Sequence, residues 1–163
     1  MEILLKGILT KLSHHYIINL TSKKRGAPMK RKPYILALPL LSLILEILPY
    51  GAVCNFANPE GTPFRETFSY FSLVPFGYAN FFPLFTGIFT CIVLILSAVY
   101  ILKQSHSLLL FTEFISWITF ALSLCPLLFG LNFYSVTGFF ISLSQLLQAI
   151  LLHIISLKNK KEK

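Results

Sequence analysis

The chain has 163 residues, of which 55% are hydrophobic and only 12% are charged, and its mean hydropathy is +0.73. A soluble domain carries about 25% charged residues, so this composition excludes an ordinary soluble globular protein and favours a chain that lies in lipid. The net charge of +8 does not indicate a nucleic-acid partner, because the basic residues flank the apolar runs. We expect the lipid bilayer as the partner, and one compact unit.

Residues 1–32 form a basic segment without a run long enough to cross a membrane, and we expect this segment to be cytoplasmic. Leu5, Leu9 and Leu12 recur at helical spacing, which is typical of an amphipathic helix at the membrane surface. The alternative is that translation starts at Met29, because the following residues read as the basic start of a bacterial membrane protein. The two interpretations stay open.

Four apolar runs follow, and each meets the length of roughly 20 residues that a helix needs to cross a bilayer. The first run precedes a long polar and aromatic interval, whereas the later runs are joined by turns of a few residues. The sequence therefore predicts an all-α polytopic membrane protein, with a four-helix transmembrane domain over 33–157 and a basic cytoplasmic tail over 158–163. The expected spans are 34–53, 81–102, 108–130 and 133–157.

The first run follows Lys30, Arg31 and Lys32, so it also resembles a signal peptide. Cys54 comes directly after Val53, where a lipoprotein signal would have a small residue, so we expect a retained anchor. Pro39 and Pro49 predict local kinks in this helix. Whether Cys54 is modified stays open.

An outer loop over residues 54–80 separates the first two spans, and the overlapping stretch from Asn55 to Phe82 is rich in aromatic residues. Its composition argues against a flexible linker, since linkers are poor in aromatic residues. We expect a folded cap over Glu46 with a short interfacial helix or hairpin-like turn over 67–74, and Arg65 paired with neighbouring acids. Membrane anchoring and contact with a ligand or partner both remain open. The candidate residues of the loop are Glu60, Arg65, Glu66, Tyr70 and Tyr78.

The basic residues fall on one side of the predicted spans. Of 14 Lys and Arg residues, only Arg65 lies in the loop between the first two spans, and the others lie in the N-terminal segment, the second turn and the tail. The positive-inside rule therefore predicts a plasma-membrane protein with both termini in the cytoplasm and the aromatic loop outside.

Two carboxylates lie inside predicted spans, where a charge is costly and usually faces the bundle interior. Glu46 is about 18 Å along a helix from Tyr34, in the outer half of the membrane. Hydroxyl and amide groups at similar depth could hydrogen-bond a protonated Glu46. Either a proton- or cation-binding site or a neutral link between helices would explain it. The candidates around Glu46 are Thr86, Thr90, Ser123, Ser142, Ser144 and Gln145, with Gln148 on the same helix face as Gln145.

Glu113 and His153 are each about one turn from the predicted cytoplasmic ends of their spans. Antiparallel helices would bring them to one depth, where they could form a proton relay or an interface-level ion pair. Small residues four apart, such as Gly138 and Ser142, are typical of close helix contacts and leave self-association or a membrane-protein partner open.

The sequence shows no catalytic motif, cofactor-binding motif or metal-ligand spacing, so we do not expect an enzyme. The expected function is that of a small membrane protein with a structural or accessory role. One alternative is a proton- or cation-coupled transporter or channel that uses Glu46, and a second is a partner-binding sensor or immunity-type protein that acts through the outer loop. Small multidrug resistance transporters also carry one Glu in the first of four helices, but their Gly-rich dimerisation helix is missing here, so no family is identified.

Overall fold

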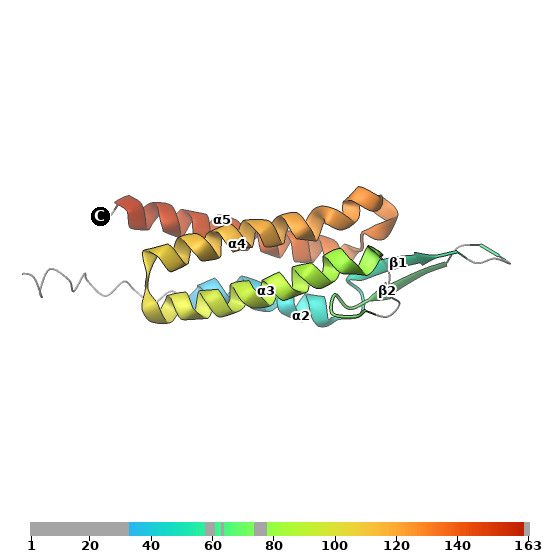
Figure 1. The fold of residues 1–163 in the computed structure, drawn as a ribbon, viewed down its shortest axis with the longest axis horizontal. Coiled ribbons are helices and arrows are strands. Elements are labelled where there is room, and N and C mark those ends of the chain that lie inside the picture. The colour runs from blue at the N-terminus through green and yellow to red at the C-terminus, as the bar shows by residue number, and fades with distance from the viewer. Residues whose placement is uncertain (1–32, 58–60, 63, 74–77, 162–163) are drawn as a thin grey trace, which may run out of the picture. The chain divides into compact units, whose positions relative to one another are not determined.

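The computed structural model of the chain describes residues 33–57, 61–62, 64–73 and 78–161, so the predicted N-terminal segment lies outside the described residues. The described protein is mostly helical (Figure 1). In chain order its elements are η1 (Pro33–Leu36), α2 (Ala37–Ile47), β1 (Ala52–Phe56), β2 (Phe64–Phe68), α3 (Tyr78–Lys103), α4 (His106–Leu124), η2 (Cys125–Phe129), η3 (Leu131–Phe133) and α5 (Val136–Lys161).

Within the described ranges, three helical stretches are long and apolar enough to cross a membrane: Phe81–Lys103, His106–Phe129 and Val136–Lys160. These stretches correspond to the second, third and fourth predicted spans, with ends displaced by a few residues. The third does not stay α-helical to its end, because Pro126 opens the 3₁₀ turn η2. The all-α membrane character predicted from the composition is therefore confirmed for these three segments.

The first predicted span is wrong at its end. The apolar helix formed by η1 and α2 covers only Pro33–Ile47, and the chain from Ala52 onward is a strand, not the last turn of a helix. Leu48 has extended backbone angles, φ −64° and ψ 141°. The residue before a proline is disfavoured in the α conformation, so Pro49 stops the helix where the sequence analysis expected a kink.

The outer loop also differs from the prediction, because it contains a β-hairpin. Strands β1 and β2 pair antiparallel, with Ala52 opposite Phe68 and Phe56 opposite Phe64. The hairpin-like turn or short helix expected over 67–74 was misplaced, because Thr67 and Phe68 belong to β2. Residues 69–72 form a separate tight turn after the hairpin, with the Ser72 N–H donating to the Ser69 carbonyl at 3.1 Å, and residue 74 lies outside the described residues. The hairpin lies at the end of the protein where α2 ends and α3 begins (Figure 1).

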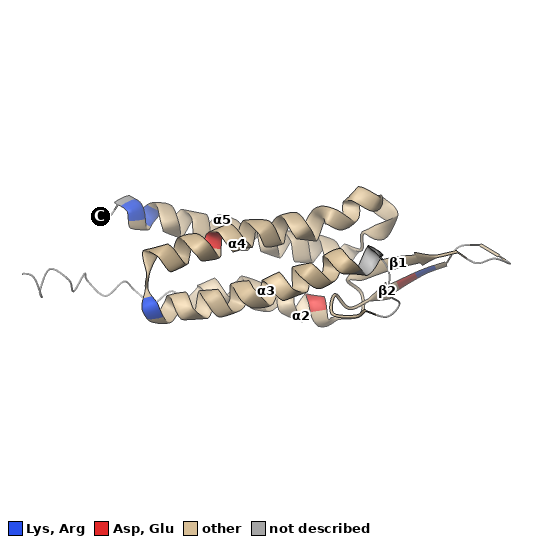
Figure 2. Cartoon of the chain, in the orientation of Figure 1, with Lys and Arg blue, Asp and Glu red and all other residues tan. Residues whose placement is uncertain are grey.

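The helices pack antiparallel in a ring: α2 contacts α3 and α5, and α4 contacts the same two helices. We call the end that carries the hairpin the hairpin end. The opposite end carries Lys103, Lys158 and Lys160, and we call it the basic end (Figure 2). The tight turn there passes through Gln104, whose φ of 50° lies in the left-handed region, and the Gln104 N–H caps α3 by donating to the Tyr100 carbonyl at 2.8 Å.

Candidate functional site

Glu46 is the centre of a buried polar cluster formed by three helices. Its side chain has no solvent exposure. The Thr90 hydroxyl of α3 donates to Glu46 Oε1 at 2.7 Å, and the Gln145 amide of α5 lies 3.4 Å from the same oxygen. Gln145 Nε2 also donates to Thr90 Oγ1 at 2.7 Å. The structure thus brings together three of the residues that the sequence analysis grouped by depth.

The other residues that the sequence analysis grouped with Glu46 also lie on the inner faces of their helices, but their side chains form hydrogen bonds with partners other than Glu46. Thr86 is buried and donates to the Phe82 carbonyl at 2.8 Å. Ser142 accepts from the Tyr134 hydroxyl at 2.6 Å and donates to the Ser123 carbonyl at 3.2 Å. Ser123 donates within its own helix, so neither serine is bonded to Glu46. One turn before Glu46, the Ser42 hydroxyl binds that of Ser144, which joins α2 directly to α5.

Several buried side-chain polar atoms have no hydrogen-bond partner among the residues that the structure describes. Glu46 Oε2 and Gln145 Oε1 belong to this cluster, whereas both side-chain polar atoms of Gln148 and Ser97 Oγ lie further along their helices toward the basic end. More than nine in ten buried polar groups in proteins are paired, with water counted as a partner. Two of these unpaired oxygens, Glu46 Oε2 and Gln145 Oε1, belong to side chains that contact one another.

The interior of the protein is polar along its length, and its lateral surface is apolar. On α4 the buried residues Thr112, Ser116, Thr119 and Ser123 follow one another at helical spacing on a single face. Thr112, Ser116 and Thr119 each donate to the carbonyl four residues earlier, so they bring hydroxyl groups inside without needing other partners. Large apolar side chains such as Ile95 and Phe114 point outward, as expected for helices surrounded by lipid.

Two apolar clusters close this polar interior. At the basic end, Ile35 packs with buried side chains of the three long helices. At the hairpin end, Ala52, Tyr70 and Ile141 form a second cluster, with Leu45 against it. Glu46 lies between the two closures. The basic-end cluster consists of Ile35, Tyr100, Leu109, Leu152 and Ile155.

The hairpin-end closure is bonded to the backbone of Glu46 itself. The Tyr70 N–H donates to the Glu46 carbonyl at 2.9 Å, and the Ser69 hydroxyl donates to the same oxygen at 3.1 Å. Burial raises the pKa of Tyr70 above its ordinary value, so its phenol stays protonated in the closure. The segment after β2 is therefore bonded to the backbone of the residue that the cap was expected to cover, and the cap itself stays a prediction.

Glu113 and His153 meet as the sequence analysis expected. His153 Nδ1 lies 2.6 Å from Glu113 Oε1, and the two side chains are 51% and 13% exposed respectively. Glu113 Oε2 is buried without a partner in the described part of the chain. The pair joins α4 to α5 near the basic end, with His153 about 12 Å along α5 from Gln145 of the Glu46 cluster. Its role as a relay or as an interface ion pair stays a prediction.

The candidate residues of the outer loop lie in different environments and do not form one cluster among the described residues. Arg65 donates from Nη2 to the Tyr134 carbonyl at 3.1 Å, whereas Glu66 is exposed on the next strand position. Glu60, its other predicted partner, lies outside the described residues, as does the side chain of Tyr78, the first residue of α3. Tyr70 is buried in the hairpin-end closure.

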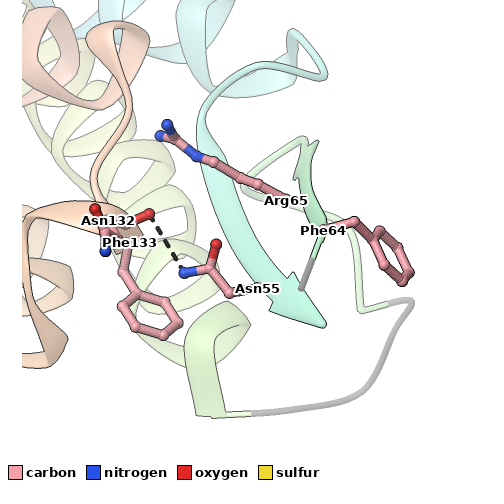
Figure 3. Close-up of a pocket in the computed structure, with 5 residues that line it drawn as sticks. All are labelled: Asn55, Phe64, Arg65, Asn132 and Phe133. Carbon is pink, nitrogen blue, oxygen red and sulfur yellow. Dashed lines mark hydrogen bonds between the residues drawn. The ribbon is translucent and has the colours of Figure 1, made fainter. Parts of the chain in front are cut away.

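Beside Arg65 the structure has a cavity of about 340 Å³ between the hairpin and the turn before α5 (Figure 3). Asn55 donates to the Asn132 carbonyl at 3.4 Å across this cavity. No pattern in the sequence indicates this cavity, because the hairpin and the turn before α5 are more than 60 residues apart along the chain.

No protein-family model, curated protein or solved structure matches this chain.

Sequence reasoning missed five members of the buried polar interior, which are Ser42, Ser97 and the α4 residues Thr112, Ser116 and Thr119. Ser42 is one helical turn from Glu46 and so faces the same way, a signal that the sequence carries. Ser97 and the α4 row that begins at Thr112 had a weaker signal, because isolated hydroxyls in a membrane helix occur on any face. Their burial on the inner faces is visible only once the four helices are packed.

Proposed function

We propose that the chain is a four-helix plasma-membrane protein of a bacterial cell, with α2 as the fourth membrane helix. The support is that α2 runs between the two closures, from Ile35 in the basic-end cluster to Leu45 at the hairpin end. Its 15 residues with η1 span about 22–25 Å, slightly less than the roughly 30 Å of hydrocarbon. The clustering of lysines at the basic end supports a cytoplasmic location for that end, with the hairpin outside.

In this arrangement Glu46 binds a proton or a small monovalent cation. The observation that carries the proposal is the asymmetry of its carboxyl group, in which Oε1 accepts from Thr90 while Oε2 is buried without a partner in the described structure. An ionised carboxylate in that position would leave a desolvated charge uncompensated, which is strongly unfavourable. A bound proton or cation removes that cost.

The atoms around Glu46 are of the type that hard cations prefer. Carboxylate, amide carbonyl and hydroxyl oxygens coordinate such ions in proteins. Gln145, whose amide nitrogen lies 3.4 Å from Glu46 Oε1, also has an amide oxygen without a partner within the described ranges, and this side chain adds a neutral oxygen beside the carboxylate. A single negative charge among neutral ligands matches a monovalent cation, or a proton that competes with it.

The two closures support a transport role for this site. A carboxyl group that is sealed from both ends cannot exchange its proton or ion unless one closure opens. Opening the hairpin end requires Tyr70 to leave, and Tyr70 is bonded to the backbone of Glu46. The protein would thus work as a small cation- or proton-coupled transporter, with Glu46 as the residue that binds the coupling ion.

The test is ion flux through the full chain in liposomes. Radioactive sodium uptake and the internal pH should both respond to an imposed sodium gradient with wild-type protein, and Glu46→Gln should abolish both responses. Glu113→Gln is the matched control, because it removes the other intramembrane carboxylate near the basic end, and it should keep the flux. Wild-type flux no greater than that of empty liposomes, or unchanged flux in Glu46→Gln, would refute the proposal.

A partner-binding role through the hairpin is the second candidate. The observation that favours it is strand β2, four of whose five residues are exposed. In that case substitutions on β2 would eliminate activity and Glu46→Gln would leave it unchanged. A purely structural or accessory role would leave flux absent in all variants, and a loss of stability in Glu46→Leu would support it.

A further inference from the structure

The tight turn over residues 69–72 is bonded to the end of α2. The last carbonyl groups of a helix have no partner within that helix. Here the Glu46 carbonyl, in the last turn of α2, accepts from the Tyr70 N–H at 2.9 Å and from the Ser69 hydroxyl at 3.1 Å. Ser69 Oγ also accepts from the Phe71 N–H at 3.1 Å, which fixes the shape of the turn. The turn therefore supplies the partners that the helix lacks at the residue with the buried carboxyl group.

The side chain of Tyr70 packs against two glycines. A Cβ added at Gly51 would lie 2.7 Å from Tyr70 Cδ1 and 2.8 Å from Tyr70 Cε1, which is closer than a real Cβ approaches another heavy atom. A Cβ added at Gly138, in α5, would lie 3.4 Å from the Tyr70 hydroxyl oxygen. The φ of Gly51 is outside the left-handed region, so its backbone does not require glycine. The Tyr70 ring is therefore the reason that position 51 has no room for a side chain.

The ring of Phe71 packs in the same way against Gly87 of α3. A Cβ added at Gly87 would lie 2.9 Å from both Cε1 and Cζ of the ring. Glycine is less favourable than alanine inside a helix, and the Phe71 ring explains a glycine at this position because it fills the place of a side chain. Gly87 is about one helical turn from Thr90, whose hydroxyl donates to Glu46. The turn after β2 is thus attached to α3 on the hairpin-end side of the Glu46 cluster.

We propose that residues 69–72 form a lid that closes the outer route to Glu46. Hydrogen bonds attach the lid to α2, and its two rings attach it to α3 and α5, the same helices that bring together Glu46, Thr90 and Gln145. Opening the lid requires both rings to leave their glycines and the Glu46 carbonyl to lose its partners, so the lid and the end of α2 move together. That the lid admits an ion rests on the ion binding proposed for Glu46, whereas the closure itself does not.

The experiment measures how fast a water-soluble thiol reagent reaches a buried cysteine next to the lid. Thr86→Cys is the reporter, because Thr86 is buried beside Gly87 and its hydroxyl donates to the Phe82 carbonyl of its own helix and not to Glu46. The full chain is studied in detergent micelles with 2-(trimethylammonio)ethyl methanethiosulfonate as the reagent, and mass spectrometry gives the labelling rate. The native cysteines are replaced by alanine at positions 54, 91 and 125. With the lid intact, labelling of the reporter should be slow.

Gly51→Ala and Gly87→Ala should each speed labelling of the reporter at least tenfold, because the added methyl group displaces the Tyr70 or the Phe71 ring. Gly130→Ala is the matched control at the same end of the protein, since its added Cβ would meet no described atom within 4 Å. It strains the backbone and should leave the labelling rate unchanged. Phe71→Ala removes one ring without adding a methyl group to the packed interior, so it is the further variant if the glycine variants do not fold, and it should also speed labelling.

Equal labelling rates in the reporter, Gly51→Ala, Gly87→Ala and Phe71→Ala would overturn the proposal, as would an equal acceleration by Gly130→Ala. Because the reporter detects access and not ion binding, labelling can respond to the lid variants in a chain that shows no ion flux, and that result would support the lid while it refutes the ion binding at Glu46. Normal flux together with labelling that ignores the lid variants would refute the lid alone.

Discussion

Replacing Glu46 by leucine tests whether this carboxyl group holds the helices together. Leucine has a similar length and no polar atoms. Thr90 would lose its bond to Glu46 Oε1 but keep its bond to the Thr86 carbonyl at 2.9 Å. Gln145 would keep its 2.7 Å bond to Thr90 and lose only the longer contact of 3.4 Å. Both neighbours therefore retain a partner.

The free energies can be compared term by term. One lost hydrogen bond between membrane helices costs about 0.6 kcal/mol on average and at most about 1.7. Removing Oε2 also removes the free-energy penalty of burying an unpaired polar atom, which is about 1–3 kcal/mol and therefore stabilises the variant. We therefore expect Glu46→Leu to be as stable as the wild-type protein or up to about 2 kcal/mol more stable. A buried carboxyl group whose loss does not destabilise the fold is not a structural link between the helices.

Unfolding of the purified chain in mixed micelles with increasing SDS, followed by circular dichroism, gives the free energy of unfolding for each variant. Thr90→Val is the matched control, because it removes the donor to Glu46 and also the acceptor of Gln145 Nε2. It should cost about 1–3 kcal/mol. If Glu46→Leu is destabilised by about 2 kcal/mol or more, the carboxyl group is a structural link and the reasoning is refuted.

Three further predictions concern the hairpin end, each measured by the same unfolding assay. Gly130→Ala should lower the free energy of unfolding by about 1–3 kcal/mol through backbone strain alone. Gly130 has a φ of +113°, and an added Cβ would meet no described atom within 4 Å. An unchanged free energy of unfolding would contradict this prediction. Ser135→Ala should lower the free energy of unfolding by about 1–2 kcal/mol. The Ser135 hydroxyl caps the N-terminus of α5 by accepting from the Gly138 N–H at 2.8 Å, and it donates to the Gly51 carbonyl at 2.6 Å. An unchanged midpoint of the SDS unfolding transition would show that neither bond stabilises the fold. Burial raises the pKa of Tyr70 in the folded protein, so the contribution of the protonated phenol to the free energy of unfolding is complete below the ordinary tyrosine pKa of about 10 and is lost as the pH rises above that value. Tyr70→Phe should weaken this loss of stability at alkaline pH. An identical pH profile for the variant and the wild-type protein would contradict the prediction.

Composition and charge placement were sufficient to predict three of the membrane helices, because a long apolar run has few alternatives. The end of the first helix was harder to predict from the sequence. The residues from Leu48 to Phe56 are nearly all apolar, and a short apolar run can be a buried strand or the end of a helix with equal periodicity. The structure ends α2 at Ile47, and the extended conformation imposed on Leu48 by Pro49 explains why.

The site around Glu46 could be predicted in part, because helix rise converts sequence position into depth. That reasoning selected Thr90 and Gln145, which do bond to Glu46 or to one another. It also selected Ser123, which faces inward but bonds within its own helix, because depth alone does not give the rotation of a helix about its axis. The cavity at Arg65 was out of reach, since it depends on how a hairpin meets a turn 69 residues away.

Proton release on sodium binding tests the central claim most directly. The purified chain is placed in weakly buffered detergent solution, sodium chloride is added, and the pH change is compared with that caused by choline chloride. If sodium displaces a proton from Glu46, the wild-type protein acidifies the solution by up to one proton per chain, and Glu46→Gln does not. An equal response from Glu46→Gln, or no proton release with sodium, lithium or potassium, would contradict the account.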